Sequence, residues 1–141
     1  MRRIALLLIG AALATNLGAG CPLGASTTTV QFVNTAAFPV EVQLFYGDSQ
    51  LAGKTALENL GTARNLTVAA GATTSFSVNC DDMQAIFIKR AAQMVIGNLG
   101  PDRETDVLSD GSDFFCGDTI TYTFTGSVLL IDFAVSSSVS N

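Results

Sequence analysis

Carboxylate side chains are the residues of this chain whose grouping suggests chemistry. Eight of the 12 Asp and Glu residues lie near Cys80, near Cys116 or in the loop before Cys116, namely Asp81, Asp82, Asp102, Glu104, Asp106, Asp110, Asp113 and Asp118. Several hard oxygen ligands in one place are what Ca²⁺ requires. Asp110 and Asp113, which flank Gly111 and Ser112, are therefore the candidate calcium ligands.

The same loop has a simpler interpretation as a solvated acidic segment with an Asp-Gly turn. The Asp-x-Asp-x-Asp-Gly spacing of calcium loops is absent, so we expect no cofactor and little effect of calcium. Glycoside hydrolysis by two carboxylates would need a substrate cleft, and the nine Phe and two Tyr fall mostly at inward strand positions. A secreted hydrolase or a calcium-dependent module that uses residues 102–118 is the alternative hypothesis.

Other catalytic chemistries are disfavoured by what the sequence lacks. It contains no histidine, which removes His-based triads, His general bases and His metal ligands. A Cys-x-x-Cys pair, a P-loop and a dinucleotide-binding fingerprint are also missing. We therefore expect a protein that is not an enzyme, and we assign no catalytic residue.

The cysteines predict a covalent link between two strand edges. Cys80 follows the strand-like residues 75–79, and Cys116 comes shortly before the strand-like residues 119–122. We predict a disulfide between them, which would close a separation of 36 positions around the least regular segment, residues 97–113. The alternative is a pair of buried free thiols, which pack well as small apolar groups.

The N-terminus has the three parts of an export signal. Met1, Arg2 and Arg3 form a charged start, residues 4–13 form an apolar run, and small residues continue to Gly20. The apolar run has ten residues, whereas a membrane-spanning helix needs about 20. We predict a signal peptide over residues 1–20.

The end of this leader resembles the lipobox of bacterial lipoprotein precursors. The matching residues are Leu17-Gly18-Ala19-Gly20-Cys21, so the resemblance covers residues 1–21 only. The family prefers an aliphatic residue where Gly18 stands. The resemblance implies cleavage before Cys21 and acyl chains such as palmitate on its sulfur. Ordinary signal peptidase cleavage after Ala14 or Ala25 is the alternative, and it would give a secreted protein.

Cysteine number and charge bear on the partners of the mature chain. An acyl group on Cys21 would leave an even pair, Cys80 and Cys116, for the disulfide. From Cys21 onward the chain has five Lys and Arg against 12 Asp and Glu, a side-chain charge of −7. This disfavours nucleic acid, which is bound by clustered cations. We expect attachment to a membrane through acyl chains, and contacts with other envelope proteins.

Period-two alternation predicts the fold. Strands are expected at residues 30–34, 40–46, 65–68, 73–78, 84–89, 93–96, 119–124 and 128–135. A capping box at Thr55 and Glu58, with Gly61 as C-cap, predicts a short helix over about residues 54–60. About eight short strands with regular turns predict an antiparallel β-sandwich, immunoglobulin-like or jelly-roll-like.

The expected organisation is a signal peptide, a tether over residues 21–28, a β-sandwich domain over residues 29–135 and a disordered tail over residues 136–141. The leading hypothesis is a non-enzymatic cell-envelope lipoprotein. It would be a lipid-anchored binding or structural module that faces the periplasm or the exterior.

Overall fold

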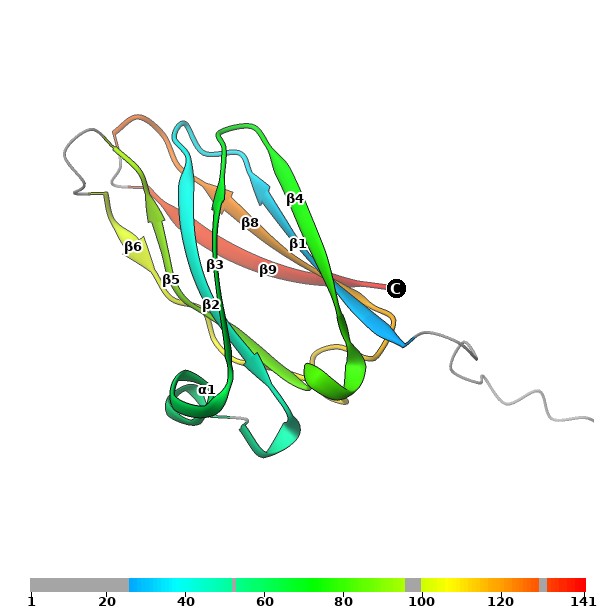
Figure 1. Ribbon diagram of the computed structural model, residues 1–141. Helices are drawn as coiled ribbons and strands as arrows, with labels where there is room; N and C mark the ends of the chain where they lie inside the picture. The colour runs from blue at the N-terminus through cyan, green and yellow to red at the C-terminus, as the bar shows by residue number, and fades with distance from the viewer. Residues whose placement is uncertain (1–25, 52, 96–99, 130–131) are drawn as a thin grey trace, which may run out of the picture.

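The computed structural model describes residues 26–51, 53–95, 100–129 and 132–141. The predicted leader, Cys21 and most of the predicted tether lie outside the described residues. The strands are β1 (Thr27–Asn34), β2 (Val40–Gly47), β3 (Thr62–Val68), β4 (Thr73–Asn79), β5 (Ala85–Gln93), β6 (Asp102–Arg103), β7 (Leu108–Ser109), β8 (Thr119–Thr125) and β9 (Ala134–Ser140) (Figure 1). The helices are α1 (Lys54–Leu60) and the 3₁₀ turns η1 (Ser49–Leu51) and η2 (Cys80–Asp82).

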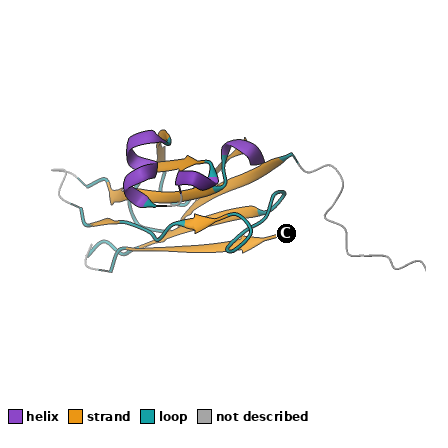
Figure 2. Cartoon of the chain, turned by 90° about the horizontal axis from the view of Figure 1, so that it is seen from below, coloured by secondary structure: helices purple, strands orange, loops and turns teal. Residues whose placement is uncertain are grey.

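The strands form two sheets packed face to face, and the helical segments lie on the outer side of one of them (Figure 2). One sheet has the order β4-β1-β8-β9, and the other has the order β3-β2-β5-β6, with β7 also paired to β5. Among the described strands, every pairing is antiparallel except that of β1 with β8, which is parallel. The predicted all-β sandwich is confirmed, with nine strands in the described residues and one parallel pair.

The main core lies between the two sheets and is built by alternation. Phe32 of β1 is fully buried, and its ring stacks on Tyr122 and Phe124 of β8 at centroid distances of 5.8 and 6.3 Å. Val42 and Leu44 of β2 face them from the other sheet and are also fully buried. Each such side chain contributes about 1.5–3 kcal/mol by leaving water. This core fixes which residues of each strand point outward.

Strand β5 is apolar on both faces because it is covered on both. Ile86 and Ile88 face the main core, while Phe87 packs with Leu57 of α1 in a second, smaller cluster. In the sequence, residues 84–89 are apolar on both faces, which predicts a central strand. This prediction is confirmed, since β2 pairs with one edge of β5 and β6 and β7 pair with the other.

The predicted helix is confirmed as α1, but its predicted capping box is wrong. The helix begins at Lys54 with Gly53 as N-cap, and no side chain caps it. Glu58 is instead drawn to Lys89 of β5, with its Oε1 2.8 Å from the Lys89 Nζ. Gly61 does serve as the C-cap, because its N–H donates to the Leu57 carbonyl.

The predicted disordered tail is wrong. Residues 134–140 form strand β9, which pairs antiparallel with all of β8 from Thr125↔Ala134 to Thr119↔Ser140. The polar sequence of this segment gives no local reason for it to be ordered. Its backbone N–H and C=O groups are ordered because they pair with those of β8. The strand predicted at residues 128–135 is wrong in its first part, since Val128 and Leu129 lie in a turn.

Two further boundaries differ from the prediction. Strand β5 runs through to Gln93, so Gln93 is its last residue rather than the first of a new strand at 93–96. Met94 follows it and donates its backbone N–H to the Pro39 carbonyl at 2.8 Å. At the N-terminal side, Thr27 and Thr28 already belong to β1, so the domain begins two residues earlier than predicted.

Candidate functional site

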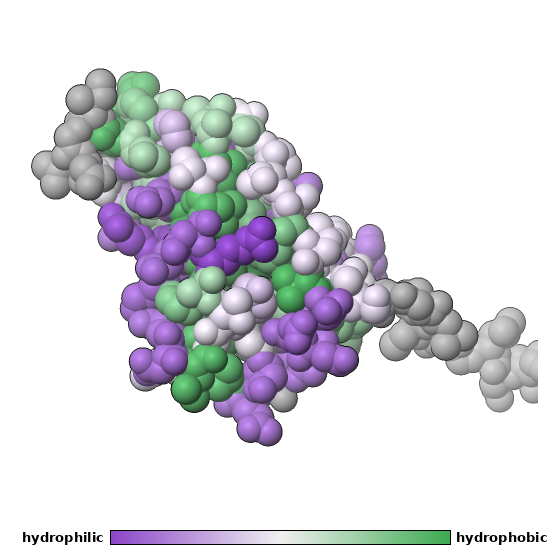
Figure 3. Space-filling view, in the orientation of Figure 1, coloured by the Kyte–Doolittle hydropathy of each residue, from purple (hydrophilic) through white to green (hydrophobic). Residues whose placement is uncertain are grey.

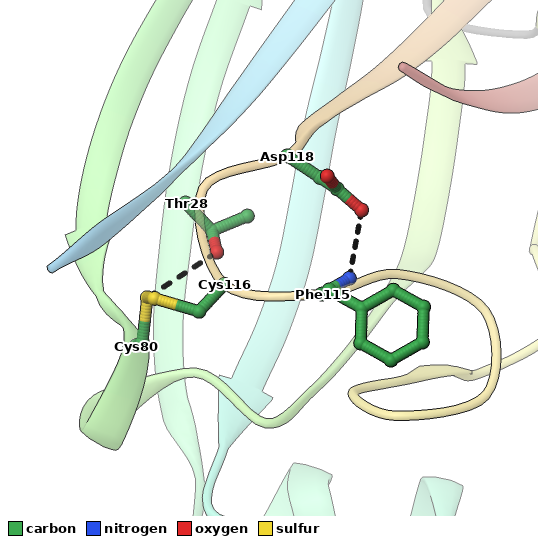
Figure 4. Close-up of a disulfide and its surroundings, with 5 residues drawn as sticks. All are labelled: Thr28, Cys80, Phe115, Cys116 and Asp118. Carbon is green, nitrogen blue, oxygen red and sulfur yellow. Dashed lines mark hydrogen bonds between the residues drawn. A yellow bond between two sulfur atoms is a disulfide. The ribbon is translucent and has the colours of Figure 1, made fainter. Parts of the chain in front are cut away.

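One end of the sandwich is held by the predicted disulfide, which is confirmed. Cys80 and Cys116 are bonded, with their Cα atoms 5.5 Å apart. Cys80 follows β4 and Cys116 precedes β8, so the bond spans β1, which lies between those strands. The Thr28 hydroxyl lies 3.7 Å from the Cys80 Sγ (Figure 4). The Cys80 N–H donates to the Ser26 carbonyl. We call this the disulfide end.

The loop that carries Cys116 is shaped by a buried aspartate. Asp118 is 7% exposed, and its carboxylate accepts the Phe115 backbone N–H at 2.8 Å (Figure 4). Its own carbonyl accepts the N–H of Thr29 at 3.0 Å, which ties the loop to β1. Gly117, which lies between Cys116 and Asp118, has φ of +100°, a conformation that residues with a side chain disfavour. Asp118 is therefore a structural residue of this turn.

The two calcium candidates, Asp110 and Asp113, form hydrogen bonds and a backbone bridge within their own loop. The Asp113 carboxylate accepts the Ser109 backbone N–H at 2.9 Å, and the backbone of Asp110 forms a bridge with Phe114. Gly111 between them has φ of +77°, so the segment is an Asp-Gly turn. Within the described ranges, no group of three or more His, Cys, Asp or Glu side chains is arranged to hold a metal ion.

Three of the remaining acidic residues of the predicted cluster, Asp102, Glu104 and Asp106, lie in ion pairs. Glu104 lies 2.7 Å from the Lys54 ammonium, which holds the pKa of the Glu104 carboxyl below its usual range. Asp102 lies 3.4 Å from Arg90. Asp106 lies 3.8 Å from the same Lys54 ammonium as Glu104, so these three carboxylates are paired with two cations.

An open hollow of about 480 Å³ lies beside η2 at the disulfide end. Tyr46, Leu60 and Val78 contribute apolar lining, while Asp48, Asp81 and Asp82 add negative charge. Asp48 accepts the Gln50 N–H, and Asp82 accepts the Asn79 amide. The lining is mainly polar, and two of its three carboxylates are already engaged within the protein.

The opposite end, which we call the distal end, is built from the described parts of four loops, residues 35–39, 69–72, 94–101 and 126–133. Their sequences contain a single ionisable side chain, Asp132. Met94, Val128 and Leu129 are exposed there by 46%, 68% and 70%. In Figure 3 green and pale atoms dominate this end, while much of the purple lies toward the disulfide end. The distal end is therefore a partly apolar surface with a single charged side chain among its described residues.

Asp132 itself is held within its loop. Its Oδ1 accepts the backbone N–H of Ser127 at 2.9 Å and the Ser127 hydroxyl at 3.1 Å. The Ser127 backbone hydrogen bond is the main reason why the pKa of the Asp132 carboxyl lies below its usual range. The one charge of the distal end is thus used to fold the loop that exposes Val128 and Leu129.

Asn34 joins two of the distal loops from inside. It is 1% exposed, and its Nδ2 donates to the carbonyls of Val68, Phe38 and Ala69 at 2.9, 3.0 and 3.2 Å. Its Oδ1 accepts the Ala36 backbone N–H at 2.9 Å. A second amide, that of Gln93, is buried without a hydrogen-bond partner among the described residues. Asn34 thus holds the loops at residues 35–39 and 69–72 together beneath the distal surface.

Sequence reasoning missed the distal surface. Val128 and Leu129 are apolar and fall within the strand predicted at residues 128–135, and this prediction gave no indication of their exposure. The available signal was the near absence of charge from four loops of an acidic chain. In the described residues, no helix is long and apolar enough to cross a bilayer.

Comparisons with known proteins give remote structural likenesses. No family model and no curated protein matches the chain. A protein from Eubacterium rectale, solved by NMR, is 12% identical over 83% of this chain and 93% of its own, with a TM-score of 0.48. The T6SS lipoprotein TssJ1 from Pseudomonas aeruginosa is 11% identical over 84% and 98%, with a TM-score of 0.45. The membrane-binding domain of pneumolysin is 14% identical over 82% and 98%, with a TM-score of 0.47. At this level of similarity, we draw no inference about function from them.

Proposed function

We propose that this chain is a non-enzymatic lipoprotein of the bacterial cell envelope. It is anchored through acyl chains on Cys21, and its β-sandwich is a binding module for a neighbouring envelope protein. The observation that carries the proposal is the lipobox-like leader followed at once by the folded domain. Strand β1 begins at Thr27, six positions after Cys21. A segment of that length spans at most roughly 20 Å, so the domain is held close to its anchor.

The disulfide supports the role of Cys21. Cys80 and Cys116 are bonded to each other, and Cys21 is the only other cysteine of the chain. An unmodified thiol in an oxidising compartment would invite unwanted pairing. Acylation of Cys21 removes that thiol. It also attaches the domain to the membrane, which matters because the domain is acidic and anionic lipids repel it.

The placement of the carboxylates supports a role without catalysis. Asp113 and Asp118 accept backbone N–H groups of their own loop, and Glu104 is paired with Lys54. Carboxylates held in this way are turn-forming and ion-pairing groups whose polar contacts lie within the protein.

The distal surface is the part of the module suited to bind a protein. Chain leaving β1 toward Cys21 starts at the disulfide end, and β1 has eight residues, which span about 25 Å. The distal loops are thus well separated from the point of attachment. Exposed Met94, Val128 and Leu129 with almost no charge around them match the charge-depleted centre of protein interfaces.

Fractionation of cells with two sets of cysteine variants tests the anchor. Cys21→Ser should leave the membrane fraction. The control, Cys80→Ser with Cys116→Ser, lacks the disulfide but should stay in the membrane fraction because it keeps Cys21. If Cys21→Ser stays membrane-bound, the anchor proposal is wrong.

Site-specific photo-crosslinking tests the distal surface. A crosslinker at Leu129, which is 70% exposed, is compared with one at Leu60, which is 75% exposed at the other end. We expect protein adducts of defined mass from position 129 and not from position 60. Adducts to lipid alone at position 129, or the same adducts from both positions, would contradict a protein-binding distal surface.

A further inference from the structure

Strand β9 is the last strand at one edge of the four-stranded sheet in the described residues. It pairs with β8 on one side, and no described strand pairs with its other side. Its seven residues contain no charge and no proline, and its register with β8 is unbroken. Natural sheets usually blunt such an edge with lysine, proline, a bulge or a covering segment. A regular uncharged edge is a template for one more strand.

The sequence of β9 is nearly symmetric about its centre. Val135 and Val139 stand two positions to either side of Ser137, and Ser136 and Ser138 flank it directly. When two antiparallel copies of this strand pair about a twofold axis at Ser137, each Val135 comes to lie opposite the other copy's Val139. Twofold interfaces are self-complementary in this way.

The two valines lie on the inner face of the sheet. Val135 pairs with Phe124 and Val139 pairs with Ile120, and both of those partners are buried in the core. Residues paired across strands point to the same face. Val139 is 37% exposed because β9 is the edge. A second copy of β9 would cover this apolar surface and pair the free backbone groups.

We propose that the chain dimerises by antiparallel pairing of β9 with β9 of a second copy. The two four-stranded sheets then join into one continuous eight-stranded sheet that runs from β4 to the partner's β4. The strand pair adds about six to eight backbone hydrogen bonds. It buries less than the roughly 1,200–2,000 Å² of a standard interface, so association is weak in dilute solution and favoured where an anchor concentrates the copies.

The dimer is compatible with two anchors in one membrane. An axis perpendicular to the sheet relates the copies, so both chains start equally far from a bilayer that lies parallel to the sheet. The outer face of this sheet is free of charge, since β1, β4, β8 and β9 contain no Asp, Glu, Lys or Arg. That face can lie toward a bilayer without the repulsion that the acidic loops would meet.

Cysteine crosslinking of the full chain in membranes tests the pairing. Ser137→Cys places two thiols directly opposite each other, at the short Cα separation that a disulfide needs. Ser140 lies opposite the partner's Ala134, so the two thiols introduced by Ser140→Cys would be roughly 20 Å apart. Thr74→Cys is the matched edge control, because Thr74 and Ser137 lie at the two ends of one row across the sheet, through Phe32 and Tyr122. The unsubstituted chain controls for links through Cys21.

We expect Ser137→Cys to give roughly tenfold more disulfide-linked dimer than Ser140→Cys or Thr74→Cys under mild oxidation. Adding Val139→Lys to Ser137→Cys should sharply reduce the yield, because the ammonium would face the partner's Val135. Equal yields at positions 137 and 140, a higher yield at position 74, or no effect of Val139→Lys would overturn the proposal. The outcome is independent of the anchor, since each yield is compared within the same fraction.

Discussion

Replacement of Asn34 by alanine should destabilise the protein strongly, because this one side chain holds two distal loops together. The change removes the amide donor to the Val68, Phe38 and Ala69 carbonyls and the acceptor for the Ala36 N–H. The bonds to Val68 and Ala36 are buried, and the other two are partly buried. A buried polar group left without a partner costs about 1–3 kcal/mol. With two such groups, we expect Asn34→Ala to lower the free energy of unfolding by about 3 kcal/mol.

Urea denaturation followed by circular dichroism measures this loss. Asn65→Ala on the exposed face of β3 is the control, and it should change stability by less than about 0.5 kcal/mol. Asn34→Asp keeps an acceptor for Ala36 but places an anion against three carbonyl oxygens. The loss of stability of Asn34→Asp relative to the parent should therefore be larger at neutral pH than in acid. In acid the protonated carboxyl donates one hydrogen bond. If Asn34→Ala costs no more than Asn65→Ala, the role given to Asn34 is refuted.

Three other predictions follow from the described contacts. Reduction of Cys80–Cys116, which closes a separation of 36 positions, should lower the free energy of unfolding by about 3–4 kcal/mol, and a denaturation midpoint unchanged by reductant would contradict this. The pKa of Asp132 is lowered in the folded protein, so its contribution to stability is present above the ordinary carboxyl range and is lost as the pH falls through about 4 and below. An NMR titration should show the protonation of Asp132 as a change in the Ser127 amide signal in the parent, and no such change in Asp132→Asn. Calcium should leave the melting temperature unchanged, whereas micromolar calorimetric binding that Asp110→Asn or Asp113→Asn abolishes would show that the acidic loop is a metal site.

The parts of the fold that alternation determines were predictable from sequence. Residues 40–46 alternate cleanly and form β2, and the apolar faces of residues 84–89 correctly indicated a central strand, β5. Strand β9 was missed because its serines have little local preference for a strand. Its order comes from pairing with β8, a partner that lies outside any local window of sequence.

The candidate site was harder to predict, because the fate of each carboxylate depends on its partners. Asp113 and Asp118 are occupied by nearby backbone N–H groups of the same loop, whereas Lys54 reaches Glu104 only through the folding of α1 against the sheet. Composition alone showed an acidic cluster that the fold disperses. The disulfide was predictable because the predicted export signal and the cysteine count constrain it without reference to the fold.

The mass of the intact mature protein tests the central claim most directly. If Cys21 is the anchor, the purified chain begins at Cys21, lacks residues 1–20 and is heavier than its sequence by the mass of its acyl chains. In Cys21→Ser this added mass should disappear. An unmodified, soluble chain that begins at Thr15 or Ser26 would contradict the account, because the domain would then be secreted without a lipid anchor.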